Sequence, residues 1–145
     1  MTIESSAFAQ NQAIPERYTC DGANINPPLT IGEPTPGTES LFSIMDDPDA
    51  PGGTFTHWYM WNITTDTKEI LEGDWPEDAE QGLNDRGELG YTGPCPPSGV
   101  HHYHFKLYAL SKKLDIPPNS TKEELEKEIE NAFISKSELV GIYSR

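Results

Sequence analysis

Apolar and polar positions alternate most clearly over residues 101–110, and this alternation predicts a β-strand. We expect the apolar end of one face to join the core. His101 and Tyr103 would then stand where the core meets the preceding loop, and pockets form at such junctions. The predicted core face carries His101, Tyr103, Phe105, Leu107 and Ala109.

Two further apolar runs predict buried strands. Residues 41–47 are apolar until they end in the carboxylates Asp46 and Asp47. Residues 55–63 are the most aromatic stretch of the chain and are largely apolar on both faces, which predicts a central strand covered on both sides. Strict alternation would place on one face of this strand Phe55, His57, Tyr59, Trp61 and Ile63.

Weaker patterns predict a first strand within residues 3–8 and a last strand over residues 138–145. One amphipathic helix is predicted, because apolar residues recur every four positions after a capping box. The box has Ser120 as N-cap and Glu123 at the third helical position, and the helix is expected to run to about Ile134.

Several short strands separated by long Pro- and Gly-rich loops predict a mainly β fold. We expect a β-sandwich with Greek-key character and one or two peripheral α-helices. The length of 145 residues suits a single domain over residues 1–145. The connection 64–88 is long for such a domain, so it is functional or holds short elements of its own.

The net charge of −14 argues against binding of nucleic acid or an anionic membrane through a broad basic surface. No apolar run approaches the ~20 residues that span a bilayer. The first residues have neither the basic nor the apolar region of a secretory signal, so the predicted location is the cytoplasm. Because thiols stay reduced there, the simplest interpretation of Cys20 and Cys95 is two buried free thiols. The sequence leaves a bridge between them open.

Polar side chains gather where the predicted strands begin or end. Asp47 and Asp49 follow one strand, His57 lies near the start of the next, and His101 with Tyr103 opens another. If these strand ends converge, the carboxylates would orient the imidazoles and favour their charged form, which makes a local anion site. The simpler interpretation of each residue alone is a turn aspartate or a hydrogen-bonded core histidine.

Three motifs occur in a fixed order along the chain. They are Asp-Pro-Asp-Ala-Pro at 47–51, His-Trp at 57–58, and Gly-Pro-Cys-Pro-Pro-Ser-Gly at 93–99 leading into His-His-Tyr at 101–103. Together they resemble the phosphatidylethanolamine-binding protein family, in particular its bacterial and archaeal branch, often called Raf kinase inhibitor-like. The segment 18–29 resembles the N-terminal signature of that branch, so the likeness covers nearly the whole chain.

The resemblance implies a non-catalytic binding protein with a small anion pocket and no cofactor or metal. Family ligands include phosphate, phosphorylethanolamine and similar anionic or zwitterionic headgroups. It also implies regulation or inhibition of a protein partner, either a kinase or a serine protease, and a homodimer. Animal members have arginine where this chain has His102, and they carry a C-terminal helical extension. The residues implied to line the pocket are Asp47, Asp49, His57, Gly93, Pro97, His101 and Tyr103.

Two alternatives from the residues stay open. In the first, Cys95 acts as the nucleophile of a small hydrolase with a histidine and an aspartate, although its proline neighbours offer no N–H groups for an oxyanion. In the second, His57, His101 and a carboxylate bind a metal ion with help from His104. Since His101 and His104 point to opposite faces of a strand, they cannot both reach one ion without distortion.

Overall fold

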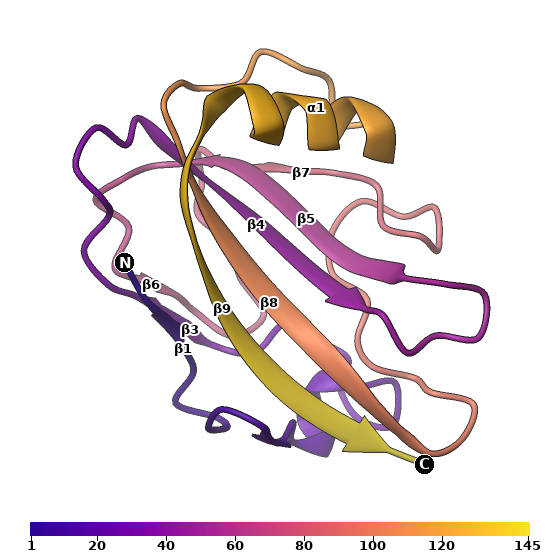
Figure 1. The fold of residues 1–145 in the computed structure, drawn as a ribbon. Coiled ribbons are helices and arrows are strands. Elements are labelled where there is room, and N and C mark those ends of the chain that lie inside the picture. Colours follow the sequence, from indigo (N-terminus) through magenta and orange to yellow (C-terminus); the bar gives the residue numbers. More distant parts are fainter.

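Four long antiparallel strands form the framework of the computed structural model, which describes residues 1–145 (Figure 1). They are β4 (Ser40–Asp47), β5 (Phe55–Ile63), β8 (Val100–Leu110) and β9 (Phe133–Ser144). The short strands β2 (Gln12–Ala13) and β7 (Glu80–Gln81) complete a six-stranded sheet in the order β2-β9-β8-β4-β5-β7. Within this sheet the later strand β8 lies beside β4, on the side away from β5 and β7, which is the spatial order of a Greek key.

A second sheet of three strands covers one face of the first. It consists of β1 (Ile3–Glu4), β3 (Leu29–Ile31) and β6 (Glu69–Ile70), in the order β1-β3-β6. Its apolar residues share one core of 17 buried residues with the inner face of the large sheet. The opposite face of the large sheet packs against the single α-helix, α1 (Lys122–Ala132), through nine further buried residues. The predicted mainly β sandwich with a peripheral helix is therefore confirmed.

The alternation predicted for residues 101–110 is confirmed in β8. All five residues of its predicted core face are buried, whereas His102 is exposed and His104 is half-buried. The same alternation separates the two carboxylates at the end of β4. Asp46 lies on the helix side, where its Oδ2 accepts a hydrogen bond of 2.9 Å from Lys106 Nζ, and Asp47 lies on the opposite side.

Strict alternation is wrong for β5, because the pairing of β4 with β5 contains a β-bulge. Met45 pairs with Trp58 and Asp46 pairs with Thr56, so His57 is the extra residue between two pairs. A bulge rotates the residues on either side of it relative to each other. Tyr59 and Trp61 consequently pack in the helix-side cluster, whereas His57 lies on the other side of the sheet. A second register shift, between Leu41 and Ser43 of β4, returns Ile63 to the side of His57.

The helix begins one residue later than predicted. Thr121 is the N-cap and its partner in the capping box is Glu124. Ser120 is not the cap because its hydroxyl donates to the Pro117 carbonyl at 2.6 Å and closes the preceding turn. The helix ends at Ala132, before the predicted end, because β9 starts immediately at Phe133 rather than at residue 138.

The other predicted boundaries shift by smaller amounts. The first strand is limited to Ile3–Glu4. The long connection 64–88 does contain short elements, namely β6 and β7. A single 3-10 turn, η1 (Glu16–Tyr18), precedes the loop that contains Cys20. The one α-helix is neither long enough nor apolar enough to cross a membrane.

The interpretation of the cysteines as free thiols is wrong, since Cys20 and Cys95 form a disulfide with their Cα atoms 5.4 Å apart. The loops that carry them also share backbone contacts. Cys20 N–H donates to the Pro94 carbonyl at 3.1 Å, and Gly93 N–H donates to Asn24 Oδ1 at 2.8 Å. The bridge removes the free thiol that the hydrolase alternative requires. Disulfides are rare in the reducing cytoplasm, so the bridge also argues against the predicted cytoplasmic location, which stays a prediction.

Candidate functional site

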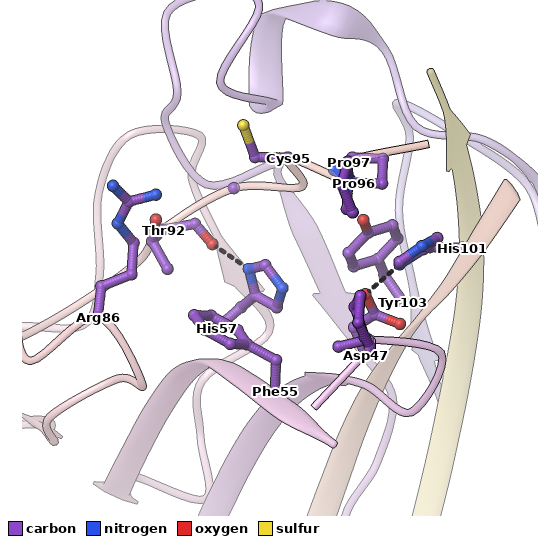
Figure 2. Close-up of a pocket in the computed structure, with 13 residues that line it drawn as sticks. Asp47, Phe55, His57, Arg86, Thr92, Cys95, Pro96, Pro97, His101 and Tyr103 are labelled. Carbon is purple, nitrogen blue, oxygen red and sulfur yellow. Dashed lines mark hydrogen bonds and ion pairs between the residues drawn. The ribbon is translucent and has the colours of Figure 1, made fainter. Parts of the chain in front are cut away.

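Three strand ends meet at one edge of the large sheet. Because β4 runs antiparallel to both β5 and β8, its last residue lies beside the first residues of the other two. The loop 92–97 faces these ends and encloses a cavity of about 180 Å³ (Figure 2). The cavity is lined by Asp47, Ala50, Pro51, Phe55, His57, Arg86, Thr92, Gly93, Cys95, Pro96, Pro97, His101 and Tyr103.

The buried pair Asp47–His101 forms one side of the cavity. His101 Nδ1–H donates to Asp47 Oδ2 at 2.6 Å, and the two side chains are only 8% and 5% exposed. The other carboxylate oxygen, Oδ1, accepts from Asp49 N–H at 2.8 Å. The carboxylate therefore fixes the orientation of the imidazole, whose Nε2 remains free of protein partners.

His57 is held differently, through a backbone carbonyl. Its Nδ1 lies 2.7 Å from the Thr92 oxygen, and since a carbonyl only accepts, Nδ1 carries the proton. Burial lowers the pKa of His57, although the Thr92 hydrogen bond and the Asp47 charge act in the opposite direction. The ring is thus neutral at pH 7 and has a lone pair on Nε2. Figure 2 shows this nitrogen on the side of the ring that faces Tyr103 and Asp47. Asp47 does favour the charged form of His57, as expected, but burial outweighs this effect.

The ring of Tyr103 packs against both imidazoles. Its ring centroid lies 5.3 Å from that of His57 and 6.4 Å from that of His101. Burial is the main cause that raises the pKa of Tyr103, and the Asp47 charge adds to it, so the phenol stays protonated at neutral pH. Phe55 packs 4.8 Å from the His57 ring on its other side. The cavity therefore holds two imidazoles and one phenol on aromatic walls.

Asp49 does not line the cavity, although the resemblance implies that it does. Its Oδ2 accepts from the backbone N–H and from Nδ1 of His102, at 2.8 and 2.7 Å. The side-chain hydrogen bond from His102 lowers the pKa of Asp49. Strand β4 ends at Asp47, and the turn that follows carries Asp49 to the outer face of β8. There it fastens the 48–53 turn to the sheet.

The structure does not arrange the histidines considered as metal ligands into a metal site, although His57 and His101 line the same cavity. His57 and His101 are held by Thr92 and Asp47, whereas His104 hydrogen-bonds Glu138 on the outer face of β8. No cluster of three metal-ligating side chains occurs in the chain. The expected cavity residues that the structure does bring together are Asp47, His57, Gly93, Pro97, His101 and Tyr103.

Sequence reasoning missed several lining residues, of which Arg86 and Thr92 are polar. Arg86 lies in a short turn inside the acidic connection, where no pattern distinguishes it from a solvated surface residue. The backbone oxygen of Thr92 accepts a hydrogen bond from His57. A sequence pattern cannot predict where a backbone carbonyl points. The only available signal for Arg86 was a basic residue between Asp85 and the motif that starts at Gly93.

The neutral state of His57 predicts a pH-dependent stability. The free energy of unfolding should fall as the pH drops below 6.5, the ordinary histidine pKa, toward the lower pKa of folded His57. In that window the unfolded chain takes up a proton that the folded chain refuses. Urea unfolding at a series of pH values from 8 to 5 measures this slope. His57→Asn should show a smaller slope than the wild type, and identical slopes would contradict the assignment.

Comparisons with known proteins show the family of this chain. The family model described as phosphatidylethanolamine-binding protein matches residues 4–144. A UPF0098 protein of Pyrococcus horikoshii is 52% identical over 97% of this chain and 75% of its own length.

Solved structures show the same fold. A phosphatidylethanolamine-binding protein homologue from Chlamydia trachomatis, CT736, superposes with a TM-score of 0.94 at 36% identity, covering 99% of this chain and 97% of the other. YbcL of E. coli superposes with a TM-score of 0.92 at 29% identity, covering 99% and 98%. The chain therefore belongs to the phosphatidylethanolamine-binding protein family, in its bacterial and archaeal branch.

Proposed function

We propose that the protein is a non-catalytic binding protein for a small anion that carries a phosphate group. The observation that carries this proposal is the orientation of His101 by a buried carboxylate, with its Nε2 left for a ligand in a cavity that also holds His57 and Tyr103. A protonated His101 and the Tyr103 hydroxyl are both donors, and donors to an anionic oxygen form the stronger, charge-assisted hydrogen bonds.

The size of the cavity limits the ligand. Cavities of roughly 150 Å³ admit a molecule the size of benzene. A volume of about 180 Å³ therefore suits a phosphate ion or a phosphate ester with a short chain. The acyl chains of a phospholipid do not fit, so any lipid would enter by its headgroup alone.

Proton balance couples binding to pH. With Nδ1–H donated to Thr92, neutral His57 offers only a lone pair to the ligand. The phosphate group of an ester dianion also offers only acceptors, so a hydrogen bond between it and His57 needs an added proton, either on the imidazole or on the ligand, whose second pKa is about 6. Binding should therefore strengthen as the pH falls and should be accompanied by proton uptake.

Calorimetric titration with phosphate and phosphorylethanolamine at pH 6 and pH 8 tests the proposal. His101→Gln should weaken phosphate binding by about 10- to 100-fold at pH 6, the range expected for one charge-assisted hydrogen bond. Repeating the titration in buffers of different ionisation enthalpy measures the proton uptake. The matched control is His102→Gln, because His102 is the neighbouring imidazole but lies on the outer face of β8. No binding by the wild type at pH 6, or equal loss in both variants, would refute the proposal.

The protein partner, whether a kinase or a serine protease, and the homodimer remain predictions from the family resemblance. The finding that supports them is family membership alone. The cytoplasmic location remains a prediction from the amino-acid sequence.

A further inference from the structure

Arg86 lies at the side of the cavity away from the Asp47–His101 pair, and His57 stands between them in Figure 2. Its backbone is firmly held. Arg86 N–H donates to Asn84 Oδ1 at 2.9 Å, and the buried Asn84 amide donates to the Gly90 carbonyl at 2.9 Å. The turn therefore presents the arginine at a fixed position on the cavity margin.

The guanidinium of Arg86 is available to a ligand. Its only ion pair, from Nε to Glu88 Oε1, is 3.8 Å long, and the two side chains are 56% and 68% exposed. Such a long and exposed pair is weak and screened by solvent. The fork of N–H groups can therefore turn to a carboxylate or phosphate, whose geometry it matches in a bidentate way.

Arg86 is also the only permanent cation of the cavity lining. His57 is neutral and Tyr103 is protonated, as argued above from their burial. The Asp47–His101 pair sums to zero when the imidazole is protonated and to −1 when it is not. In a chain with a net charge of −14, Arg86 thus decides whether the cavity attracts or repels an anion.

An ammonium group finds poor accommodation in the same cavity. Asp47 is the only carboxylate of the lining, and both of its oxygens already accept hydrogen bonds, from Asp49 N–H and from His101. The other acids near the margin lie outside the lining. Glu88 lies beside Arg86, Asp85 accepts from Thr56 N–H, and Asp49 accepts from His102. A zwitterionic headgroup would place its positive end against the guanidinium or against an engaged carboxylate.

We propose that Arg86 selects ligands with a second anionic group: small phosphate esters whose other end carries a carboxylate or another phosphate. This rests on the proposed function, since the phosphate is placed at the imidazoles. The second anionic group then forms a bidentate pair with Arg86, which excludes phosphorylethanolamine as the preferred ligand.

Phosphoglycolate and phosphorylethanolamine form a matched pair of probes, because they are similar in length and differ in the sign of the distal charge. In calorimetry at pH 7, the wild type should bind phosphoglycolate at least about tenfold more tightly than phosphorylethanolamine. Arg86→Gln should remove this preference by weakening phosphoglycolate alone, and Arg86→Lys should retain part of it. Lys68→Gln is the control for loss of one positive charge, because Lys68 pairs with Glu33 away from the cavity.

The outcomes separate this inference from the proposed function. If phosphate binds and depends on His101, but the wild type prefers phosphorylethanolamine or Arg86→Gln keeps the preference for phosphoglycolate, the role of Arg86 is wrong and the anion site stands. If none of the three probes binds to the wild type, both proposals are wrong.

Discussion

Replacing Cys95 by Ser is expected to lower the free energy of unfolding by about 4–4.5 kcal/mol. The bridged cysteines are 75 residues apart, so the disulfide removes much of the chain entropy of the unfolded state. The loop-entropy relation gives about 3 kcal/mol for a loop of ~15 residues and about 4.7 kcal/mol for ~100 residues. Since domains are stable by only about 5–15 kcal/mol, this is a large fraction of the total. Chemical denaturation of the oxidised protein and of the variant measures the difference.

The double variant Cys20→Ser/Cys95→Ser provides the control. A reductant should destabilise the wild type to about the level of the double variant and should leave the double variant unchanged. If the reduced wild type unfolds at the same denaturant concentration as the oxidised protein, the bridge contributes nothing and the expectation fails. Cys95 is exposed, so the reductant has access to the bridge.

Gly93→Ala should lower the free energy of unfolding by about 2–4 kcal/mol, because the added methyl group overpacks the contact between two loops and one hydrogen bond is lost. A Cβ at this position would lie 2.3 Å from the Tyr18 carbonyl oxygen and 2.4 Å from Asn24 Oδ1. These atoms belong to another loop, which must move away and give up the hydrogen bond from Gly93 N–H. The shift also displaces the neighbouring Thr92 carbonyl that holds His57, so phosphate affinity should fall together with stability.

Gly52→Ala is the matched control for this substitution. Gly52 lies in the 48–53 turn beside the cavity, has an ordinary φ, and has no atom within 4 Å of its added Cβ. Its free energy of unfolding should stay within about 0.5 kcal/mol of the wild type. Equal behaviour of the two alanine variants in thermal unfolding would show that the contact between the two loops is not the cause.

The sequence predicted secondary structure best where apolar and polar residues alternate regularly over many positions. The ten-residue alternation that starts at His101 predicted β8, its core face and the place of the polar pair at its mouth. Strands β1, β6 and β7 have two residues each, and no period can be recognised over such a length. The capping box was displaced by one residue because the Ser120 hydroxyl has a second acceptor in the preceding turn.

Contacts between distant loops were beyond sequence reasoning. The disulfide depends on two loops that lie together only in the folded chain. Arg86 belongs to the acidic connection and reaches the cavity because Asn84 folds the turn around it. Asp49 follows Asp47 by two residues, which suggests a common face, yet β4 ends between them and alternation no longer applies. Of the seven residues that the family resemblance implies, six line the cavity, but the resemblance could not report these local departures.

The extra residue in β5 has a consequence for protein engineering. His57 interrupts the regular pairing of β5 with β4, because its neighbours Thr56 and Trp58 pair with β4 and it does not. A redesign that straightened the edge of the sheet for thermal robustness would delete this position first. The strands would still align, but the cavity would lose one of its two imidazoles, so an algorithm that rewards ideal backbones would erase the feature that distinguishes this edge from ordinary sheet.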